Sequence, residues 1–429
     1  MKKIKMMMAA ALGVLVSCGS VKSGEEAIAA SRESKVVVAY VTSWSEVMPD
    51  PQYMTHINYA FGHVNESFNG VKIDNEERLR QIVDLRKQKP ELKVLLSIGG
   101  WGSGRFSEMA ANDEYRRAFA ADCDRVVKEF ALDGIDIDWE YPTSSMANIS
   151  SSPDDTENFT LLMQDIRAAI GNEKELTLAT VASARYIDFK AILPSVDFVN
   201  IMAYDMASAP KHHSALYPSG HSGDITSDGA VTAHLKAGVP PSKLVMGMPF
   251  YGRGGDGYPS FQDYNKVGNT DTQYTEKWDE VAQVPYLADK NDTLVFGFEN
   301  PRSLAIKCQY ILDKDLLGGM YWDYSGDNEQ GDLRRTVAEN LLGKPHKAKV
   351  LVLTERGGQH GGFTDAGLRW LAAEGAKGNF SITEINNARN ITEAYLSQFS
   401  LVIQLDFPPY TWPKDCLLYT SPSPRDMRI

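Results

Sequence analysis

Cysteine and positive charge are both scarce in this chain. Four cysteines among 429 residues are too few for a disulfide framework. Cys123 and Cys308 fall in helix-like segments, and we expect both to be buried free thiols. Lys and Arg total 44 against 56 Asp and Glu, so the formal net charge is −12. This acidity argues against nucleic acid or an anionic membrane face as a partner, and a neutral polymer such as a glycan suits it better.

The N-terminal apolar run, residues 6–16, is too short to span a membrane and follows a basic start, as in a secretory signal. The tetrapeptide LVSC, residues 15–18, resembles a bacterial lipobox. This resemblance implies a lipoprotein signal peptide over residues 1–17 and an acylated Cys18. The protein would then be lipid-anchored in the bacterial cell envelope, facing the periplasm or the outer surface, with no other membrane contact. A cleaved signal with a chance cysteine is the alternative. Residues 18–34, rich in Ser, Gly, Glu and Ala, are then a flexible tether.

From residue 35 the chain alternates between apolar strand-like segments and amphipathic helices, a pattern typical of parallel α/β proteins. Eight such strands, most of them followed by a helix, predict a TIM (β/α)8 barrel over residues 35–343. An open, doubly wound sheet is the alternative, but no glycine-rich phosphate loop follows the first strand. The strands are expected at residues 36–44, 57–64, 93–101, 132–142, 176–183, 196–205, 243–253 and 318–327.

The fourth of these segments, LDGIDIDWEYP, carries four acids: Asp133, Asp136, Asp138 and Glu140. Because side chains alternate along a strand, the last three share one face, and the Ile and Trp residues between them share the other. Three ionised carboxylates roughly 6 to 7 Å apart repel one another, so such a row shares at least one proton, which raises the pKa of one member. A carboxyl group that keeps its proton near neutral pH is suited to general-acid catalysis. A solvated acidic strand or a calcium loop fits the apolar opposite face less well.

The acidic run matches the DxxDxDxE signature of glycoside hydrolase family 18, the chitinase family. SIGGW, residues 97–101, resembles the family motif on the third strand, and IMAYD, residues 201–205, resembles the motif on the sixth strand. The resemblance covers about residues 35–343. It implies a catalytic barrel that needs no metal and no cofactor, and a substrate such as chitin or another N-acetylglucosamine-containing glycan. We expect a monomer.

The resemblance assigns catalytic roles to residues of this sequence. Glu140 would be the acid, and Asp138 would orient and stabilise the acetamido nitrogen of the substrate. Asp136 would hold or release the proton that it shares with Asp138, supported by Tyr40 and Ser97. Tyr204 would hydrogen-bond the N-acetyl group, and Trp322 would form the floor under the sugar at the cleaved bond. The further substrate contacts expected are Phe61, Gly99, Gly100, Trp101, Tyr141, Met202, Asp205, Tyr251 and Arg253.

No second carboxylate has an evident claim to be the nucleophile, and the family solution is attack by the substrate's own acetamido oxygen with retention of configuration. Chitinases with deep clefts carry a sizeable α+β insertion after the seventh strand, and residues 254–300 of this chain are short by comparison. The comparison implies a reduced wall of the substrate cleft, a shallower groove and internal rather than processive cleavage. The resemblance therefore implies a retaining endo-acting chitinase. An endo-β-N-acetylglucosaminidase acting on N-glycans and a non-catalytic glycan-binding lectin are the alternatives, although a lectin relative usually lacks the glutamate that Glu140 supplies.

A second α/β pattern begins after the barrel, at residues 344–415. It resembles the start of a ThuA-like domain, which implies an incomplete flavodoxin-like segment, and its lone His360 is expected to be structural. Residues 416–429, which begin CLLYTSPSPRD, fit neither domain. Their sequence is that of a translated sequencing adapter, so we expect this tail to be non-native.

Overall fold

The computed structural model describes residues 35–255, 258–267, 274–343, 348–354, 361–376, 380–386, 391–396, 399 and 401–405. The chain divides into two compact units, Met1–Gly343 and Lys344–Ile429. Residues 1–34 with Cys18, His360 and the tail 416–429 lie outside the described residues, so the sequence-based expectations for them stay predictions.

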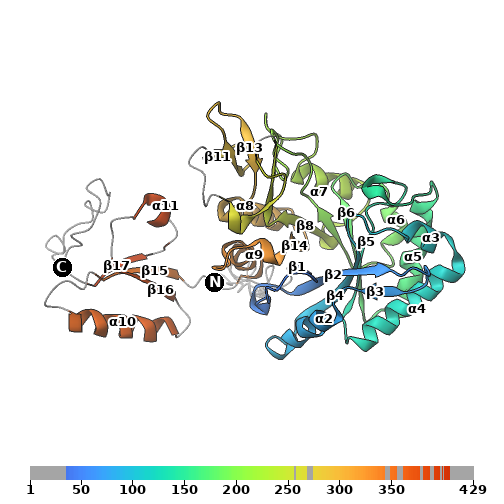
Figure 1. Ribbon diagram of the computed structural model, residues 1–429, viewed down its shortest axis with the longest axis horizontal. Coiled ribbons are helices and arrows are strands. Elements are labelled where there is room, and N and C mark those ends of the chain that lie inside the picture. Colours follow the sequence, from blue (N-terminus) through green and yellow to red (C-terminus); the bar gives the residue numbers. More distant parts are fainter. Residues whose placement is uncertain are drawn as a thin grey trace, which may run out of the picture. The chain divides into compact units, whose positions relative to one another are not determined.

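The first unit is a closed barrel of eight parallel strands, as the sequence predicts (Figure 1). Each strand pairs with the next one around the ring, and β1 pairs with both β2 and β14, which closes it. The barrel strands are β1 (Val36–Thr42), β2 (His56–Val64), β4 (Lys93–Gly99), β5 (Gly134–Asp138), β6 (Glu175–Val181), β7 (Phe198–Met202), β8 (Leu244–Pro249) and β14 (Gly318–Trp322). A short strand, β3 (Val71–Ile73), pairs antiparallel with β2.

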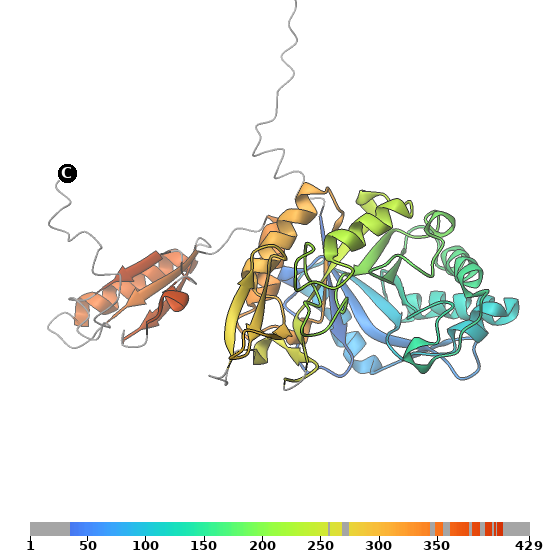
Figure 2. The ribbon, with the colours of Figure 1, turned by 90° about the horizontal axis from the view of Figure 1, so that it is seen from above.

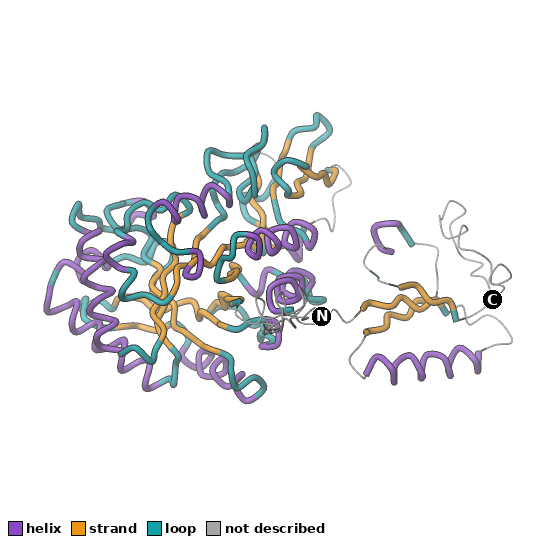
Figure 3. Tube along the Cα trace, turned by 180° about the vertical axis from the view of Figure 1, so that it is seen from behind, coloured by secondary structure: helices purple, strands orange, loops and turns teal. Residues whose placement is uncertain are grey.

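Helices cover the outside of the strands (Figures 1 and 3). Their positions follow sequence signals: Asn112 caps α4 through its side chain, and Asn300 with Ser303 forms a capping box at α8, where Pro301 occupies the first turn. The helices are α2 (Glu76–Val83), α3 (Phe106–Ala111), α4 (Asp113–Glu129), α5 (Asp155–Ile170), α6 (Phe189–Ile192), α7 (Ser227–Lys236), α8 (Pro301–Asp313) and α9 (Asp332–Leu342).

The period-two alternation of the strands divides the core into two layers. On β1, Val37 and Ala39 face the helices and belong to the large outer core, whereas Val38 and Tyr40 face the barrel interior. Cys123 and Cys308 are buried free thiols, as the sequence predicts. Among the described residues, no helix is long and apolar enough to cross a membrane.

The sequence prediction of one seventh strand over residues 243–253 is wrong in its second half. That segment forms two strands: β8 stays in the barrel, and β9 (Tyr251–Gly254) joins a five-stranded antiparallel sheet at one side of it (Figure 2). The sheet has the order β10-β9-β13-β12-β11, so the segment after β8 builds a substantial layer of its own. Its other strands are β10 (Gln262–Asp263), β11 (Thr275–Asp279), β12 (Val284–Ala288) and β13 (Leu294–Gly297).

The described part of the second unit is a small parallel sheet with the order β16-β15-β17. The ThuA-like resemblance remains a prediction. The elements are β15 (Ala348–Leu353), α10 (Gly361–Ala376), β16 (Phe380–Ile385), α11 (Glu393–Leu396) and β17 (Leu401–Gln404).

Candidate active site

The acidic strand β5 places its carboxyl groups inside the barrel. Asp136 and Asp138 are almost completely buried in the barrel interior, with 0% and 4% exposed. Ile135, Ile137 and Trp139 pack in the outer core, so the alternation predicted for this strand is confirmed. The first acid of the signature has a different place. The Asp133 carboxylate accepts hydrogen bonds from the Val94 amide, 2.7 Å away, and from Arg86, and it precedes the strand.

Asp136 is the anchor of the interior network. Its Oδ2 accepts hydrogen bonds from the hydroxyls of Tyr40, at 2.9 Å, and Ser97, at 2.8 Å. Its Oδ1 accepts from the Thr177 hydroxyl, at 2.6 Å, and from the Asn200 amide, at 3.3 Å. Four donors on one carboxyl group favour its ionised form, because an ionised carboxylate is an acceptor only.

The neighbouring carboxyl group, Asp138, has the opposite environment. Its Oδ1 is buried and has no hydrogen-bond partner among the described residues. Burial raises the pKa of Asp138 well above its usual range, and the carboxyl groups of Glu140 and Asp136 raise it further. Burial also raises the pKa of Asp136, but its four hydrogen bonds oppose that effect. Of the two carboxyl groups, Asp138 is therefore the one whose surroundings favour the protonated form more strongly.

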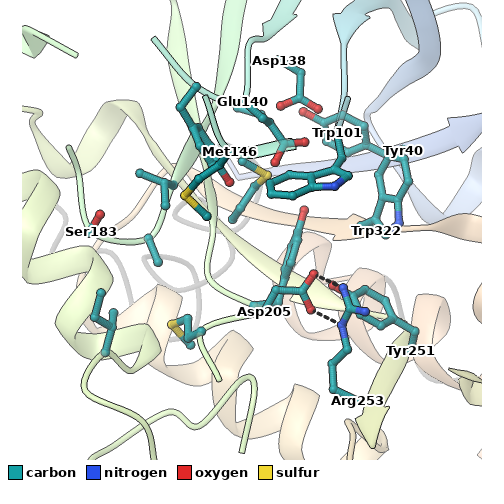
Figure 4. A pocket seen from close by; sticks show the side chains of 18 of the residues that line it. Tyr40, Trp101, Asp138, Glu140, Met146, Ser183, Asp205, Tyr251, Arg253 and Trp322 are labelled. Atoms are coloured by element: carbon teal, nitrogen blue, oxygen red, sulfur yellow. Dashed lines mark hydrogen bonds and ion pairs between the residues drawn. The ribbon is translucent and has the colours of Figure 1, made fainter. Parts of the chain in front are cut away.

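Glu140 follows the end of β5 and reaches the cleft at the C-terminal end of the barrel, where TIM-barrel enzymes hold their active sites. Burial raises the pKa of Glu140 to about 7; the interaction with Tyr141 lowers it, and the charge of Asp205 raises it. In Figure 4 the side chains of Asp138 and Glu140 both point into the cleft. A carboxyl group that is half protonated near neutral pH can both donate and accept a proton during one reaction.

The cleft has a volume of about 710 Å³ and combines this acid with polar groups from other strands. Burial, followed by the charges of Asp138 and Glu140, raises the pKa of the Tyr204 phenol well above its usual range, so the hydroxyl stays a donor. Asp205 forms a two-pronged ion pair with Arg253, with Nε–Oδ1 and Nη2–Oδ2 distances of 2.7 and 2.5 Å (Figure 4). Burial raises the pKa of Asp205, but hydrogen bonds from Arg253 and His213 outweigh it and hold the pKa well below the usual range.

Flat aromatic side chains form part of the cleft lining. The rings of Phe61 and Trp322 stack with centroids 5.6 Å apart, and Tyr40 lies 5.7 Å from Trp322. Trp101 lines the cleft with 62% of its surface exposed. Tyr251, a residue of the inserted sheet, also lines the cleft. Phe261, from residues 254–300 where the sequence suggested a reduced wall, lines the cleft as well, so that segment contributes directly to the site.

Most of the predicted site residues lie together around this cleft, and a few lie behind it. Ser97 is fully buried and acts only through Asp136. Gly99 and Gly100 do not line the cleft. Gly99 has a φ of 131°, and a Cβ there would lie 2.0 Å from the carbonyl oxygen of Asp138, so glycine is needed for the close approach of β4 and β5. The predicted residues that line the cleft are Tyr40, Phe61, Trp101, Asp138, Glu140, Tyr141, Met202, Tyr204, Asp205, Tyr251, Arg253 and Trp322.

Sequence reasoning missed two kinds of residue. Thr177 and Asn200 donate to Asp136 from neighbouring strands; their alternation predicts an inward face but not which partner they meet. The other kind lies on loops beyond the strand ends, where the aromatic character of Trp44, Tyr186 and Phe261 gave the only signal. The missed residues that line the cleft include Trp44, Met146, Ser183, Arg185, Tyr186 and Phe261. Among the described residues, no group of three or more His, Cys, Asp or Glu side chains could hold a metal ion.

Comparison with known proteins identifies the barrel. Residues 36–327 match the family described as glycosyl hydrolases family 18. The chain belongs to this family. It is therefore a glycoside hydrolase of the chitinase family, and the match ends before the second unit begins.

Relatives in this family are about 30% identical to this chain over the aligned residues. Chitotriosidase-1 of Mus musculus is 31% identical over 350 residues, which cover 69% of this chain and 74% of the relative. Chitinase A1 of Niallia circulans is 29% identical, and the alignment covers 71% of this chain but only 58% of that relative. The solved structure of a family 18 N-acetylglucosaminidase from Paenibacillus barengoltzii is 32% identical, with a TM-score of 0.66, and covers 72% of this chain and 100% of its own.

Proposed function

We propose that the family 18 barrel is a retaining, endo-acting chitinase that hydrolyses β-1,4-linked N-acetylglucosamine polymers or oligomers by substrate-assisted catalysis. The observation that carries this proposal is the set of three acids that line the cleft. Glu140 has a pKa raised to about 7, burial raises the pKa of Asp138 well above its usual range so that it keeps its proton, and Asp205 is engaged by Arg253. Among the described cleft residues this leaves one acid–base group and no carboxylate free to attack the sugar.

The proposed reaction therefore uses the substrate as its own nucleophile. The 2-acetamido oxygen attacks the anomeric carbon while Glu140 gives its proton to the departing glycosidic oxygen. The resulting oxazolinium ion carries its positive charge beside Asp138, and the Tyr204 hydroxyl hydrogen-bonds the acetamido oxygen. Glu140, now ionised, takes a proton from a water molecule that attacks the anomeric carbon and opens the oxazolinium ring. The water attacks from the face that the departing sugar occupied, opposite the acetamido oxygen. Both proton transfers thus return Glu140 to its starting state, and configuration is retained.

The aromatic lining supports a polymeric substrate built of sugar rings. Sugars stack their C–H faces on flat aromatic groups, and the Trp322 and Phe61 rings offer such a surface inside the cleft. Trp44 and Trp101, with 64% and 62% of their surfaces exposed, offer further flat surfaces toward solvent. Stacking contacts with several sugar rings of one chain favour cleavage at an internal bond of that chain. The N-acetylglucosaminidase relative supports the competing mode, release of single sugars from an end.

Product analysis separates these activities. The parent protein and the Glu140→Gln variant are incubated with N-acetylglucosamine hexamer, with high-mannose glycoprotein and with cellulose oligomers. An endo-acting chitinase releases dimers to tetramers from the hexamer first, with the β-anomer in excess, and does not cleave cellulose oligomers. Early accumulation of monosaccharide contradicts endo action, release of intact N-glycans supports the glycoprotein-directed alternative, and binding without cleavage by the parent supports a lectin.

We further propose that Cys18 is acylated and anchors the protein in the cell envelope, on the basis of the LVSC sequence alone. Expression in a bacterium fed a labelled fatty acid tests this. Label on the parent chain and none on a Cys18→Ala variant is expected; label on neither contradicts acylation. Accessibility of the labelled chain to protease added to intact cells then distinguishes the outer surface from the periplasm.

A further inference from the structure

Arg185 is a cation in the wall of the cleft that the reaction described above does not use. It belongs to the segment that follows β6, at the C-terminal end of the barrel, and its side chain is exposed. Its Nε donates a hydrogen bond to the Ser183 hydroxyl at 3.0 Å. Among the described residues, no carboxylate lies within ion-pair distance of its guanidinium group. The cleft is therefore lined by one positive charge that has no acidic partner.

The segment that carries Arg185 is held in a defined shape. Ala184 and Tyr186, on either side of it, have left-handed backbones with φ of 55° and 74°. Such backbones cost free energy in residues other than glycine and persist only where the surroundings hold them. The Ala184 amide donates to the Val181 carbonyl at 3.1 Å. The Thr156 hydroxyl of α5 donates to the Tyr186 carbonyl at 2.9 Å, so the backbone is fixed on both sides of the arginine.

Two stacked aromatic rings join Arg185 to the acid of the reaction. Its guanidinium carbon lies 5.5 Å from the centroid of the Tyr186 ring, within the range of a cation–π contact. The Tyr186 ring stacks on the Tyr141 ring, with centroids 5.5 Å apart and an interplanar angle of 12°. Tyr141 directly follows Glu140 in the sequence. The guanidinium group and the acid therefore belong to one continuous wall of the cleft.

This wall is the one that the leaving sugar would meet. The sugar at the cleaved bond is placed on Trp322, which stacks on Phe61. Figure 4 shows Ser183, the hydrogen-bond partner of Arg185, and Trp322 on opposite sides of Glu140. Glu140 gives its proton to the oxygen of the leaving sugar. That sugar therefore lies beyond Glu140 from Trp322, on the side of Arg185.

The other charged side chains of the cleft lining are matched or neutralised. Asp205 and Arg253 pair with each other. Asp138 and Glu140 have raised pKa values, so both carry little charge in mildly acidic solution. A protonated amine on a sugar beside Arg185 would therefore meet a like charge that no ion pair compensates. Like-charge repulsion is a means by which a site rejects one ligand and still accepts its neutral counterpart.

We propose that Arg185 is a specificity-determining residue: its positive charge keeps protonated glucosamine out of the leaving-group side of the cleft. Loss of the N-acetyl group converts a neutral amide of chitin into an amine, which takes up a proton and becomes cationic. The sugar at the cleaved bond needs its acetamido group for the proposed reaction, whereas the leaving sugar needs it because of Arg185. The inference rests on the proposed function, and it narrows the substrate to chitin that is acetylated on both sides of the cleaved bond.

Three substitutions isolate the charge. Arg185→Gln removes the charge and keeps a polar side chain, and Arg185→Lys keeps the charge. Arg302→Gln is the matched control. Arg302 is also an exposed arginine that stacks on an aromatic ring, 3.8 Å from the centroid of Trp278, but it does not line the cleft.

The test identifies the sugars at the newly formed chain ends. Each full-length protein digests partially deacetylated chitin of known composition at about pH 6, and mass spectrometry identifies both ends of the products. The new non-reducing end reports the leaving sugar, and glucosamine should be depleted there in the parent. The depletion should weaken by about 3-fold in Arg185→Gln, the scale of one exposed charge pair, and persist in Arg185→Lys and Arg302→Gln. Raising NaCl from about 0.05 to about 0.5 M should weaken it in the parent but not in Arg185→Gln, because salt screens exposed charges.

The outcomes separate the inference from the proposed function. Equal glucosamine fractions at the new non-reducing end in the parent and Arg185→Gln overturn the inference. An equal rise in Arg185→Gln and Arg185→Lys assigns the effect to the shape of the guanidinium group and overturns it as well. Glucosamine at the new reducing end contradicts substrate assistance, while the comparison at the other end still decides the role of Arg185.

A parent protein that cleaves nothing contradicts the proposed function, and binding then decides the inference. Calorimetry measures the affinities of the parent and Arg185→Gln for N-acetylglucosamine tetramer and for glucosamine tetramer. The preference for the acetylated tetramer should fall by about 3-fold in the variant. An unchanged preference overturns the inference.

Discussion

The hydroxyl of Tyr40 on β1 donates a 2.9 Å hydrogen bond to Oδ2 of Asp136 on β5, through the interior of the barrel. This contact helps to resolve the repulsion expected within the acidic row. With three further donors, Asp136 is the carboxyl group best suited to carry the charge, and its partner-poor neighbour Asp138 is best suited to carry the proton. Before the reaction starts, the negative charge is therefore favoured on Asp136 and the proton on Asp138.

Removing one donor from Asp136 should disturb this distribution. Thr177→Val deletes the shortest of its four hydrogen bonds, at 2.6 Å, and leaves a buried carboxylate oxygen with a weaker partner. A hydrogen bond to a charged group contributes about 1.5–3 kcal/mol, so the free energy of unfolding should fall by about that amount. We also expect kcat to fall by on the order of 10-fold, since the proton is then less firmly placed on Asp138. Denaturant unfolding and steady-state kinetics measure both effects.

The same strand offers the control. Thr180 on β6 is equally buried, but its hydroxyl has no hydrogen-bond partner among the described residues. Thr180→Val therefore removes an unsatisfied polar group and should leave stability and kcat unchanged or slightly raised. If both valine variants lose the same stability and activity, the four-donor network around Asp136 is not what holds the acidic row.

Activity should depend on the protonated form of Glu140 in the free enzyme. Its pKa of about 7 predicts that kcat/KM is retained below pH 7 and falls as pH rises through that value. Glu140→Gln should lower kcat by on the order of 10² or more and remove this alkaline limb, while oligosaccharide binding survives. Kinetics on N-acetylglucosamine oligomers and calorimetric binding measure the two parts. Turnover near the parent value in the variant would exclude Glu140 as the acid.

The Trp322 ring should contribute mainly to binding of the sugar at the cleaved bond. It stacks on Phe61 with an interplanar angle of 21° and lines the cleft. Trp322→Ala should weaken binding by on the order of 10-fold, the scale of an aromatic contact together with its buried area. Trp370→Ala is the comparison, because Trp370 is 63% exposed and belongs to the second unit. Equal affinities of the two variants for chitin oligomers would remove Trp322 from the binding surface.

The barrel and its acidic row could be predicted because they follow from short-range periodicity. Alternation along residues 132–142 alone separates Asp136 and Asp138 from the isoleucines, and the structure confirms that separation. The partners of Asp136 could not be predicted in the same way. Thr177 lies opposite Asp136 only because of the register between β5 and β6, and register depends on the packing of the whole sheet.

The inserted sheet shows a second limit. Residues 244–252 contain no charged side chain and look like one strand, but β9 leaves the barrel and pairs with β10 and β13. Its partner β13 lies some forty residues later in the chain. Local patterns predict an apolar strand near residues 243–253, whereas the assignment of a segment to one sheet or another depends on pairings between distant segments.

The raised pKa of Glu140 also predicts how stability depends on pH. The value rises from 4.5 to about 7 on folding, so the folded state favours the protonated carboxyl group. Below pH 4.5 the group is protonated in both the folded and unfolded states and costs nothing. Between pH 4.5 and 7 the unfolded chain gains a stabilising ionisation that the folded chain resists, and the free energy of unfolding falls. Above pH 7 the loss is complete.

Glutamine cannot ionise, so Glu140→Gln should escape this loss. The variant should gain stability relative to the parent as pH rises, reaching at most about 3 kcal/mol above pH 7, and the gain should vanish near pH 4.5. Urea unfolding of both proteins at pH 4.5, 6 and 8 measures it, with Glu114→Gln, a substitution at an exposed position of α4, as the control. A difference in unfolding free energy that is the same at all three pH values would show that Glu140 ionises as readily inside the cleft as in the unfolded chain. Its protonation would then not be a property of the folded barrel.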